Sequence, residues 1–169
     1  MHFYFIFITI FSISLYAVEV DLCRHFLIRT SLNIDSNELQ NCTNSKSFDS
    51  YISSYIKKSQ EVTQIKESDI LFVKRLGKDE ENRKLFNQQL QLESLKFKEW
   101  YLDLLLTTQQ PFQEKMVFFW HNHFVSSLQK VRQPKLMLLQ NELFRKYAFG
   151  NFKQFVHKII KDPAMLIYL

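Results

Sequence analysis

The longest helical pattern in the chain lies between Asp79 and about Thr107. This stretch contains no Gly or Pro, and its apolar residues recur in a 3.6-residue rhythm among Lys, Glu and Gln. They are Leu85, Leu92, Leu95, Trp100, Leu102 and Leu106. The spacing predicts one long amphipathic helix.

Three prolines mark the starts of three further helices. Proline suits the first turn of a helix, because the N–H that it lacks would have no partner there. We therefore predict helices from Pro111 to about Ser127, from Pro134 to Phe149, and from Pro163 onward. Gly150 is expected to end the second in a left-handed C-cap, and Asp162 is expected to cap the third.

Shorter helical patterns precede Asp79. Apolar residues recur at helical spacing over residues 21–31, and Asp35 with Glu38 resembles a capping box that opens a second helix. The polar stretch 41–47 is typical of a loop. Two more helices are predicted, one around residues 51–56 and one that Ser68 caps and Gly77 closes.

The first 17 residues have the pattern of a secretory signal peptide. An apolar run from Phe3 to Tyr16 precedes Ala17, and it is shorter than the about 20 residues that a membrane-spanning helix needs. We predict cleavage after Ala17 and a helical domain over residues 18–169, located in the periplasm or outside the cell. Because only His2 and the amino terminus supply positive charge before the run, an uncleaved membrane anchor is the alternative. No other segment is long and apolar enough to span a membrane.

The two cysteines, Cys23 and Cys42, admit two interpretations. In an oxidising compartment they could form a disulfide, which would add about 3 kcal/mol in the chain-entropy model. Alternatively, Cys23 is a small core residue on the apolar face that Phe26 and Leu27 share. We favour the second interpretation, because Cys42 falls in the predicted polar loop.

Composition restricts the fold class. The 169 residues fit one domain, and 46% hydrophobic and 15% aromatic residues, with 17 Phe, are enough for a sizeable core. The only glycines, Gly77 and Gly150, are too few for a hairpin-rich sheet protein and exclude the glycine-rich phosphate-binding loops. We predict an all-α protein, an irregular multi-helix bundle that forms an incomplete domain.

The net charge of +5 and the isoelectric point near 9.1 do not indicate a nucleic-acid partner. The closest basic pairs, Lys57-Lys58 and Lys74-Arg75, fall in separate segments rather than along one stripe. A solvated surface is the simpler interpretation, and we expect no binding of nucleic acid.

Candidate chemistry is concentrated in residues 118–124, FFWHNHF. Successive helical residues turn by about 100°, so His121 and His123 point about 200° apart and cannot bind one metal ion together. Neither has a carboxylate one turn away, and Glu114 and Asp162 are the candidate acidic partners. Apolar residues on nearly every side predict that this helix is the central, buried element of the bundle.

Two interpretations of the histidines stay open. In the first, His121, Asn122 and His123 make hydrogen bonds that tie the central helix to its neighbours, because an unpaired buried polar group costs about 1 to 3 kcal/mol. In the second, one imidazole is the base or the metal ligand of a pocket. We favour the first. The pattern identifies no cofactor-binding residue, and the metal and the cofactor, if any, are unknown.

Two other polar residues have simpler roles. Arg145 is expected to pair with a carboxylate or a helix end, and Asn151 to cap a helix that begins at Phe152.

The segments PFQEKMVFFWHNHFVSS, FRKYAFGNFKQFV and KDPAMLIYL resemble, in that order and spacing, the bacterial family known only as domain of unknown function 1800 (DUF1800). CRHFLIRTSLNIDSNEL is similar to the start of that family. The matching positions in the later segments are Glu114, Trp120, His121, Asn122, His123, Phe124, Arg145, Gly150, Asn151, Phe152, Asp162, Pro163, Ala164 and Met165.

The resemblance implies an exported helical protein and no established reaction. It also implies that family members continue beyond the point that corresponds to Leu169, so we expect this chain to be the N-terminal piece of a longer protein. The apolar residues after Pro163 support the same expectation. If the family's site needs carboxylates from the absent part, this chain alone would be inactive.

The sequence therefore predicts an exported helical protein of an uncharacterised family, with an unknown activity. Two alternatives remain: part of a metal- or histidine-dependent enzyme that a missing C-terminal half completes, or a periplasmic binding or assembly module. Apart from that missing half, no partner is predicted.

Overall fold

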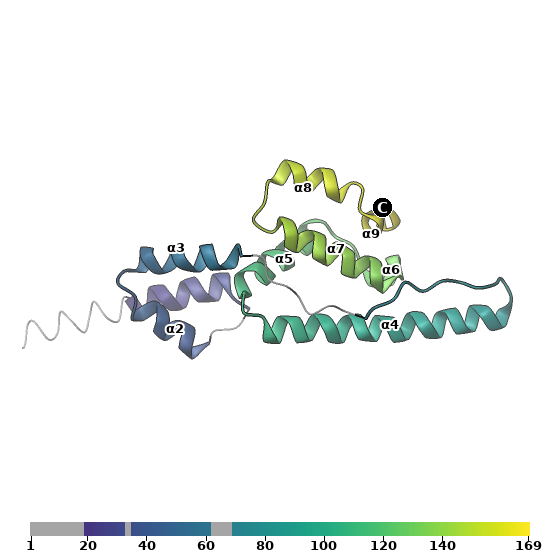
Figure 1. Cartoon of the computed structure of the whole chain (residues 1–169), viewed down its shortest axis with the longest axis horizontal. Coiled ribbons are helices and arrows are strands. Elements are labelled where there is room, and N and C mark those ends of the chain that lie inside the picture. Colours follow the sequence, from purple (N-terminus) through teal and green to yellow (C-terminus); the bar gives the residue numbers. More distant parts are fainter. Residues whose placement is uncertain (1–18, 33–34, 62–68) are drawn as a thin grey trace, which may run out of the picture. The chain divides into compact units, whose positions relative to one another are not determined.

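The protein is all-α, as the sequence predicts. The computed structural model describes residues 19–32, 35–61 and 69–169, and every regular element within these ranges is a helix (Figure 1). The predicted signal peptide, residues 1–17, lies outside the described residues. Among the helices that are described, none is long and apolar enough to cross a membrane.

The chain divides into two compact units, Met1–Glu61 and Val62–Leu169. We describe each unit by itself. The expectation of one domain over residues 18–169 stays a prediction.

The first unit contains a helix over residues 19–30, α2 (Ser36–Thr43) and α3 (Phe48–Ser59). The side chain of Asp35 accepts a hydrogen bond from the Asn37 backbone N–H and caps α2, as predicted. Helix α2 continues to Thr43, so the predicted loop over residues 41–47 is wrong in its first three residues. The helical extension turns Cys42 into the interior, where it is 1% exposed.

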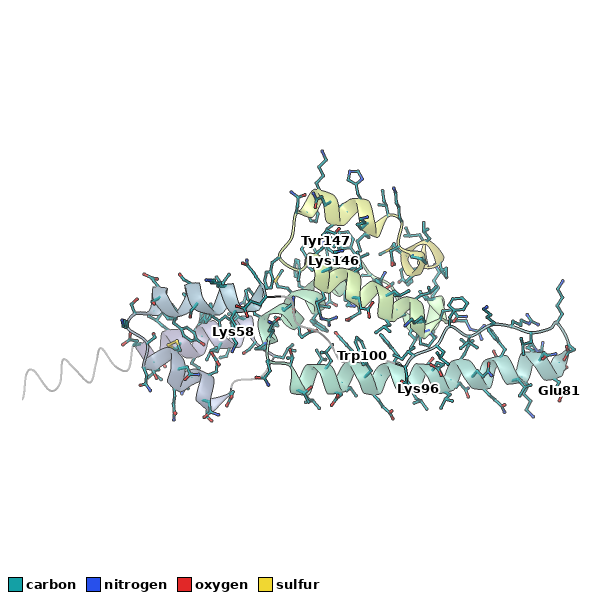
Figure 2. The ribbon with its side chains drawn as sticks, in the orientation of Figure 1. Lys58, Glu81, Lys96, Trp100, Lys146 and Tyr147 are labelled. Carbon is teal, nitrogen blue, oxygen red and sulfur yellow. A yellow bond between two sulfur atoms is a disulfide. The ribbon has the colours of Figure 1, made fainter. Side chains whose placement is uncertain are left out.

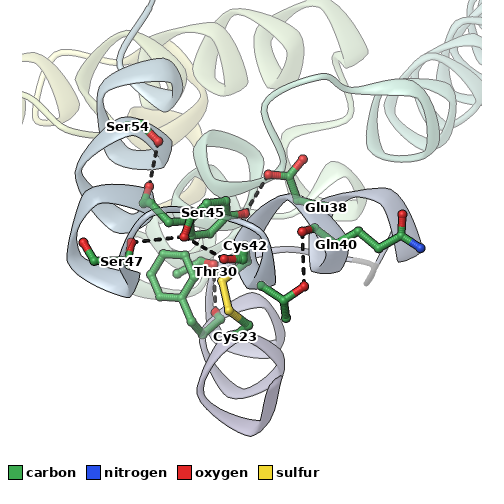
Figure 3. The surroundings of a disulfide bond; sticks show 11 residues. Cys23, Thr30, Glu38, Gln40, Cys42, Ser45, Ser47 and Ser54 are labelled. Atoms are coloured by element: carbon green, nitrogen blue, oxygen red, sulfur yellow. Dashed lines mark hydrogen bonds between the residues drawn. A yellow bond between two sulfur atoms is a disulfide. The ribbon is translucent and has the colours of Figure 1, made fainter. Parts of the chain in front are cut away.

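Cys23 and Cys42 form a disulfide, with their Cα atoms 5.9 Å apart (Figure 3). The favoured interpretation, in which Cys23 is only a small core residue, is therefore wrong, although Cys23 is indeed fully buried. Aromatic rings complete this core: Phe26 makes edge-on contacts with Phe48, Tyr51 and Tyr55.

The second unit contains six helices within residues 69–169. They are α4 (Glu80–Thr107), α5 (Pro111–His123), α6 (Leu128–Val131), α7 (Pro134–Tyr147), α8 (Phe152–Ile159) and α9 (Pro163–Tyr168). The prolines start their helices as predicted, and the side chains of Asp79, Asn151 and Asp162 cap α4, α8 and α9.

Two predicted helix ends in this unit are wrong. Helix α5 ends at His123 rather than near Ser127, because the Ser127 side chain accepts a hydrogen bond from the Lys130 N–H and starts α6. Helix α7 ends at Tyr147, and Gly150 is not left-handed, since no glycine within the described residues has a positive φ.

Helix α7 occupies the centre of the second unit. It packs against α4, α5, α6, α8 and α9, and Phe144 and Leu138 on it are almost fully buried. The 111–127 segment was expected in this place. Instead, α5 covers one side of α7 and leaves Phe118 and Phe119 about half exposed, at 49% and 51%.

Helix α4 faces α7 with residues that the 3.6-residue pattern did not single out. Leu90 and Glu93 are buried, and Phe97 packs against the small core of Val131, Met137 and Ala164. The leucines of the predicted stripe are exposed instead. Side chains project from α4 both toward α7 and away from it (Figure 2).

Residues 69–77 are not a helix, contrary to the prediction. Side chains far away in sequence satisfy the backbone of this segment in a non-helical form. The Leu71 N–H donates to Glu93 Oε2 (2.7 Å), and the Gln133 amide both accepts from the Val73 N–H (3.3 Å) and donates to the Val73 carbonyl (2.9 Å). Ile70 and Val73 are buried, and Leu71 and Phe72 between them in sequence are exposed.

Candidate functional site

The predicted acidic partner Glu114 is tied to Arg145. Glu114 lies in the first turn of α5 and is 2% exposed, while Arg145 lies in the last turn of α7 and is 6% exposed. Arg145 Nε donates to Glu114 Oε1 (2.8 Å) and Nη2 donates to Oε2 (2.6 Å). This fork geometry occupies both carboxylate oxygens, and it confirms the expectation that Arg145 pairs with a carboxylate.

Tyr101 on α4 lies in the electrostatic field of this pair. Burial is the largest cause of the raised pKa of its hydroxyl. The Glu114 carboxylate raises that pKa further and the Arg145 guanidinium lowers it. The pair itself is buried, which is the environment in which a single unpaired charge would be most destabilising.

His121 lies two turns after Glu114 on α5, against α7. Its ring meets Phe144 edge-on at a centroid distance of 4.4 Å, and its Nε2 lies 3.2 Å from Asn141 Nδ2. Because the amide nitrogen can only donate, Nε2 accepts and the ring is neutral with its proton on Nδ1. Burial, and secondly the charge of Arg145, lowers the pKa of His121 to about 4.

Two buried polar atoms beside His121 have no hydrogen-bond partner in the described part of the chain. They are Asn141 Oδ1, an acceptor, and Arg145 Nη1, a donor. Asn141 and Arg145 are four residues apart on α7, so their side chains share one face of the helix. This face therefore carries two buried polar side chains, each with one atom that has no hydrogen-bond partner among the described residues.

His123 and Asn122 do not share this environment. Both are exposed, and the Asn122 amide donates to the Phe118 carbonyl of its own helix (3.1 Å). The His123 ring stacks on Phe119, with centroids 6.1 Å apart and planes 12° apart. The expectation of an internal partner is therefore wrong for Asn122, whose bond is local. The His123 ring also contacts the rings of Trp120 and Phe124.

Trp120 anchors the end of α5. Its Nε1–H donates to the Ala148 carbonyl (3.3 Å), and its ring meets Phe155 edge-on at 5.0 Å. Val117 and Phe144 belong to the same apolar cluster. The aromatic residues around the histidines are thus divided between a packed side and an exposed side.

Asp162, the second candidate acid, caps α9. It is 5% exposed, and its Oδ2 accepts from the Met165 N–H (2.9 Å) and from Gln140 Nε2 (2.7 Å). Burial raises its pKa, whereas these two bonds and one from the Ala164 N–H lower it. Gln140 also accepts a hydrogen bond from Ser126. No contact among the described residues joins Asp162 to either histidine.

The structure therefore brings together Glu114, Arg145, Asn141 and His121, and places His123 and Asp162 elsewhere. Within the ranges that are described, no group of three or more His, Cys, Asp or Glu residues is arranged to hold a metal ion. Sequence reasoning missed Asn141. Its signal is a polar residue one turn before Arg145 on a helix face that otherwise carries Leu138 and Phe144.

A separate groove of about 850 Å³ lies between α4 and α6. Its walls combine leucines with amide and cationic side chains, among them Leu95, Gln91, Lys98 and Arg132. Arg132 is left-handed, with φ 59°, and its Nη2 donates to Asn87 Oδ1 (2.9 Å).

One family model matches residues 25–169, and its description is "Protein of unknown function (DUF1800)". The chain belongs to the DUF1800 family. No curated protein and no solved structure matches the chain. The DUF1800 match includes residues 25–61 of the first unit, the whole second unit and all the residues of the candidate site.

Proposed function

We propose that this DUF1800 protein works outside the cytosol as a helical binding or assembly module, rather than as a catalyst assembled from its own residues. One observation carries the proposal: both candidate carboxylates are already engaged. Glu114 gives both oxygens to Arg145, and Asp162 holds the N-terminus of α9 and Gln140.

The state of His121 supports the same conclusion. A general base near neutral pH needs a pKa close to the working pH and an orienting partner that stabilises the imidazolium. Desolvation and Arg145 hold the pKa of His121 near 4, and its accepting nitrogen already faces the Asn141 amide. These contacts connect α5 to α7, which is the structural role that we favour for the histidine.

The disulfide supports a location outside the cytosol. Disulfides persist in oxidising compartments and are rare in the reducing cytosol. The signal-like pattern of residues 1–17 points the same way.

Export is tested by expressing the full chain in a bacterium and separating periplasm from cytosol. We expect a periplasmic product that has lost residues 1–17 and whose Cys23 and Cys42 resist alkylation until a reductant is added. A matched variant without residues 2–17 should stay in the cytosol with two reactive thiols. Full-length protein in the cytosol with free thiols would contradict the proposal.

The structural role of the histidines is tested with His121→Ala and His123→Ala. We expect His121→Ala to destabilise the second unit by about 1 to 3 kcal/mol, because it leaves the Asn141 amide unpaired. His123→Ala should change the unfolding free energy by less than about 0.5 kcal/mol, because the ring is exposed. Elemental analysis of the purified wild-type protein should find metal far below one ion per chain.

A histidine-dependent enzyme is the second candidate, and one observation favours it. Asn141 Oδ1 and Arg145 Nη1 are buried beside His121 and could bind a group that the described residues do not supply. A stoichiometric metal ion that is lost in His121→Ala, with an unchanged melting temperature, would favour this candidate over the assembly module.

A further inference from the structure

The exposed side of α4 carries a regular apolar seam. Its positions follow one another at intervals of three and four residues. Each leucine among them is at least 48% exposed. The seam consists of Leu85, Gln88, Leu92, Leu95, Glu99 and Leu102, and Leu106 continues it at 84% exposed. This is the spacing of the first and fourth positions of a heptad, sustained over three heptads.

The rest of the unit does not use the seam. Leu90, Glu93 and Phe97 lie on the opposite side of α4 and are buried or packed inside the unit. Helix α4 has 28 residues, which makes it about 42 Å long. A solvated surface of this length with leucines at heptad spacing fits a second helix of the same kind.

We propose that the seam is a self-association surface, in which α4 pairs with α4 of a second copy of this chain in antiparallel orientation. The proposal rests on the assembly-module function proposed above and names its partner.

The order of polar and apolar positions along the seam selects the antiparallel orientation. In an antiparallel pair, first positions of one heptad face fourth positions of the other. If Leu92 faces Leu95 of the second copy, then Leu85 faces Leu102 of that copy, and two-fold symmetry repeats both layers. The two polar positions then meet in one layer, where the Gln88 amide can donate to the Glu99 carboxylate of the second copy.

A parallel pair lacks this match. It would place the two Glu99 carboxylates directly opposite each other inside the seam, which is a like-charge contact in a partly desolvated position. A buried polar layer of matched residues also fixes the register of paired helices.

The charges beside the seam are compatible with the antiparallel register. Lys84 faces Leu105 of the second copy, Lys96 faces Gln89, and Lys98 faces Gln91, so no two like charges meet. On one flank, Gln91, Leu95 and Lys98 also line the groove between α4 and α6, so this groove borders the seam.

The first experiment measures the mass of the exported full chain by sedimentation and light scattering over a range of concentrations. We expect twice the mass of one chain, and a dissociation constant at least about 100-fold higher in Leu92→Glu/Leu95→Glu. Leu76→Glu is the matched control, because Leu76 is also exposed (84%) but lies outside α4. A wild-type monomer, or a double variant that still has the doubled mass, would overturn the proposal in favour of another occupant.

Cysteine cross-linking then tests the orientation. Positions 88 and 99 are about 16 Å apart along one helix, so Gln88→Cys/Glu99→Cys can close disulfides only between copies. We expect at least about 10-fold more oxidised dimer in this double variant than in either single variant. Equal cross-linking of Gln88→Cys alone would indicate parallel pairing and overturn the register. The export test and the histidine variants do not change α4. A negative result in those tests of the proposed function can therefore be told apart from a negative result in the tests of self-association.

Discussion

The two compact units are stabilised by different kinds of interaction. The first unit holds three short helices together with a disulfide and a small cluster of aromatic rings. The second unit, within residues 69–169, contains no cysteine and relies on apolar packing around α7 and on the buried Glu114–Arg145 pair. In the small unit, where the apolar core is limited, a disulfide adds stability. In the larger unit, the core also contains a buried ion pair.

The difference predicts separate vulnerabilities. A reductant should act on the first unit, whereas a change in charge or in pH should act on the second. Both tryptophans, Trp100 and Trp120, lie in the second unit, so their fluorescence follows that unit alone. Hydrogen exchange over residues 19–61 follows the first.

The largest expected effect is that of Glu114→Ala. It leaves the Arg145 guanidinium buried without a counter-charge, and we expect a loss of about 3 to 5 kcal/mol in the unfolding free energy. Urea denaturation followed by tryptophan fluorescence measures it. The matched control is Arg83→Ala, which breaks the exposed Arg83–Glu80 pair and should change stability little.

A double variant sharpens this test. Glu114→Leu with Arg145→Met removes both charges and keeps apolar volume, so its loss should be smaller than that of Glu114→Ala. If the double variant is less stable than Glu114→Ala, the ion pair itself stabilises the fold, and the loss in Glu114→Ala is not due only to the uncompensated charge of Arg145.

The next effect is that of Cys23→Ser/Cys42→Ser. The two cysteines are separated by 19 positions in sequence, and opening a loop of this size should cost about 3 kcal/mol. Exchange over residues 19–61 should accelerate by about two orders of magnitude, whereas the fluorescence transition of the second unit should keep its midpoint. A shift of that midpoint by the same free energy would show that the units unfold together.

A smaller effect concerns pH. The pKa of His121 is lowered from 6.5 to about 4 in the folded protein, so the unfolded chain binds a proton first as the pH falls. Stability is therefore unaffected by this group above pH 6.5 and decreases between pH 6.5 and 4, by about 1 to 3 kcal/mol. His121→Gln should remove this decrease. His157→Gln, at an exposed position of α8, should keep it.

The smallest expected effect is that of Tyr51→Phe in the first unit. It removes the hydrogen bond from the Tyr51 hydroxyl to Glu38 Oε1 (2.6 Å) and leaves the ring in place. We expect a loss of about 1 kcal/mol, measured by hydrogen exchange over residues 19–61. A loss as large as that of the cysteine variants would mean that this bond between α2 and α3 stabilises the first unit as much as the disulfide between the helix over residues 19–30 and α2.

Local signals in the sequence predicted most of the helix starts. Proline at a first turn and Asp or Asn at a cap act through neighbouring backbone groups, so Asp35, Asn151 and Asp162 could be assigned without the fold. Residues 69–77 could not, because their backbone is satisfied by Glu93 and Gln133, which lie 22 and 60 positions away.

The faces of helices were harder to predict than their starts. Helix α4 is apolar on two sides, and periodicity alone selected the exposed side. The disulfide was missed because it requires α2 to continue through Cys42. In the candidate site, the need of His121 for a partner was predictable from burial, but Asn141 as that partner depends on how α5 packs against α7.

The Gln133 side chain makes with Val73 the pair of hydrogen bonds that a residue of a neighbouring β-strand would make. Its amide supplies both a donor and an acceptor at the reach that a neighbouring backbone would have. Glutamate offers no donor, asparagine is one methylene shorter, and lysine offers no acceptor. This position should therefore reject nearly every replacement in a selection for folded protein, even though its surroundings look like an ordinary helix start.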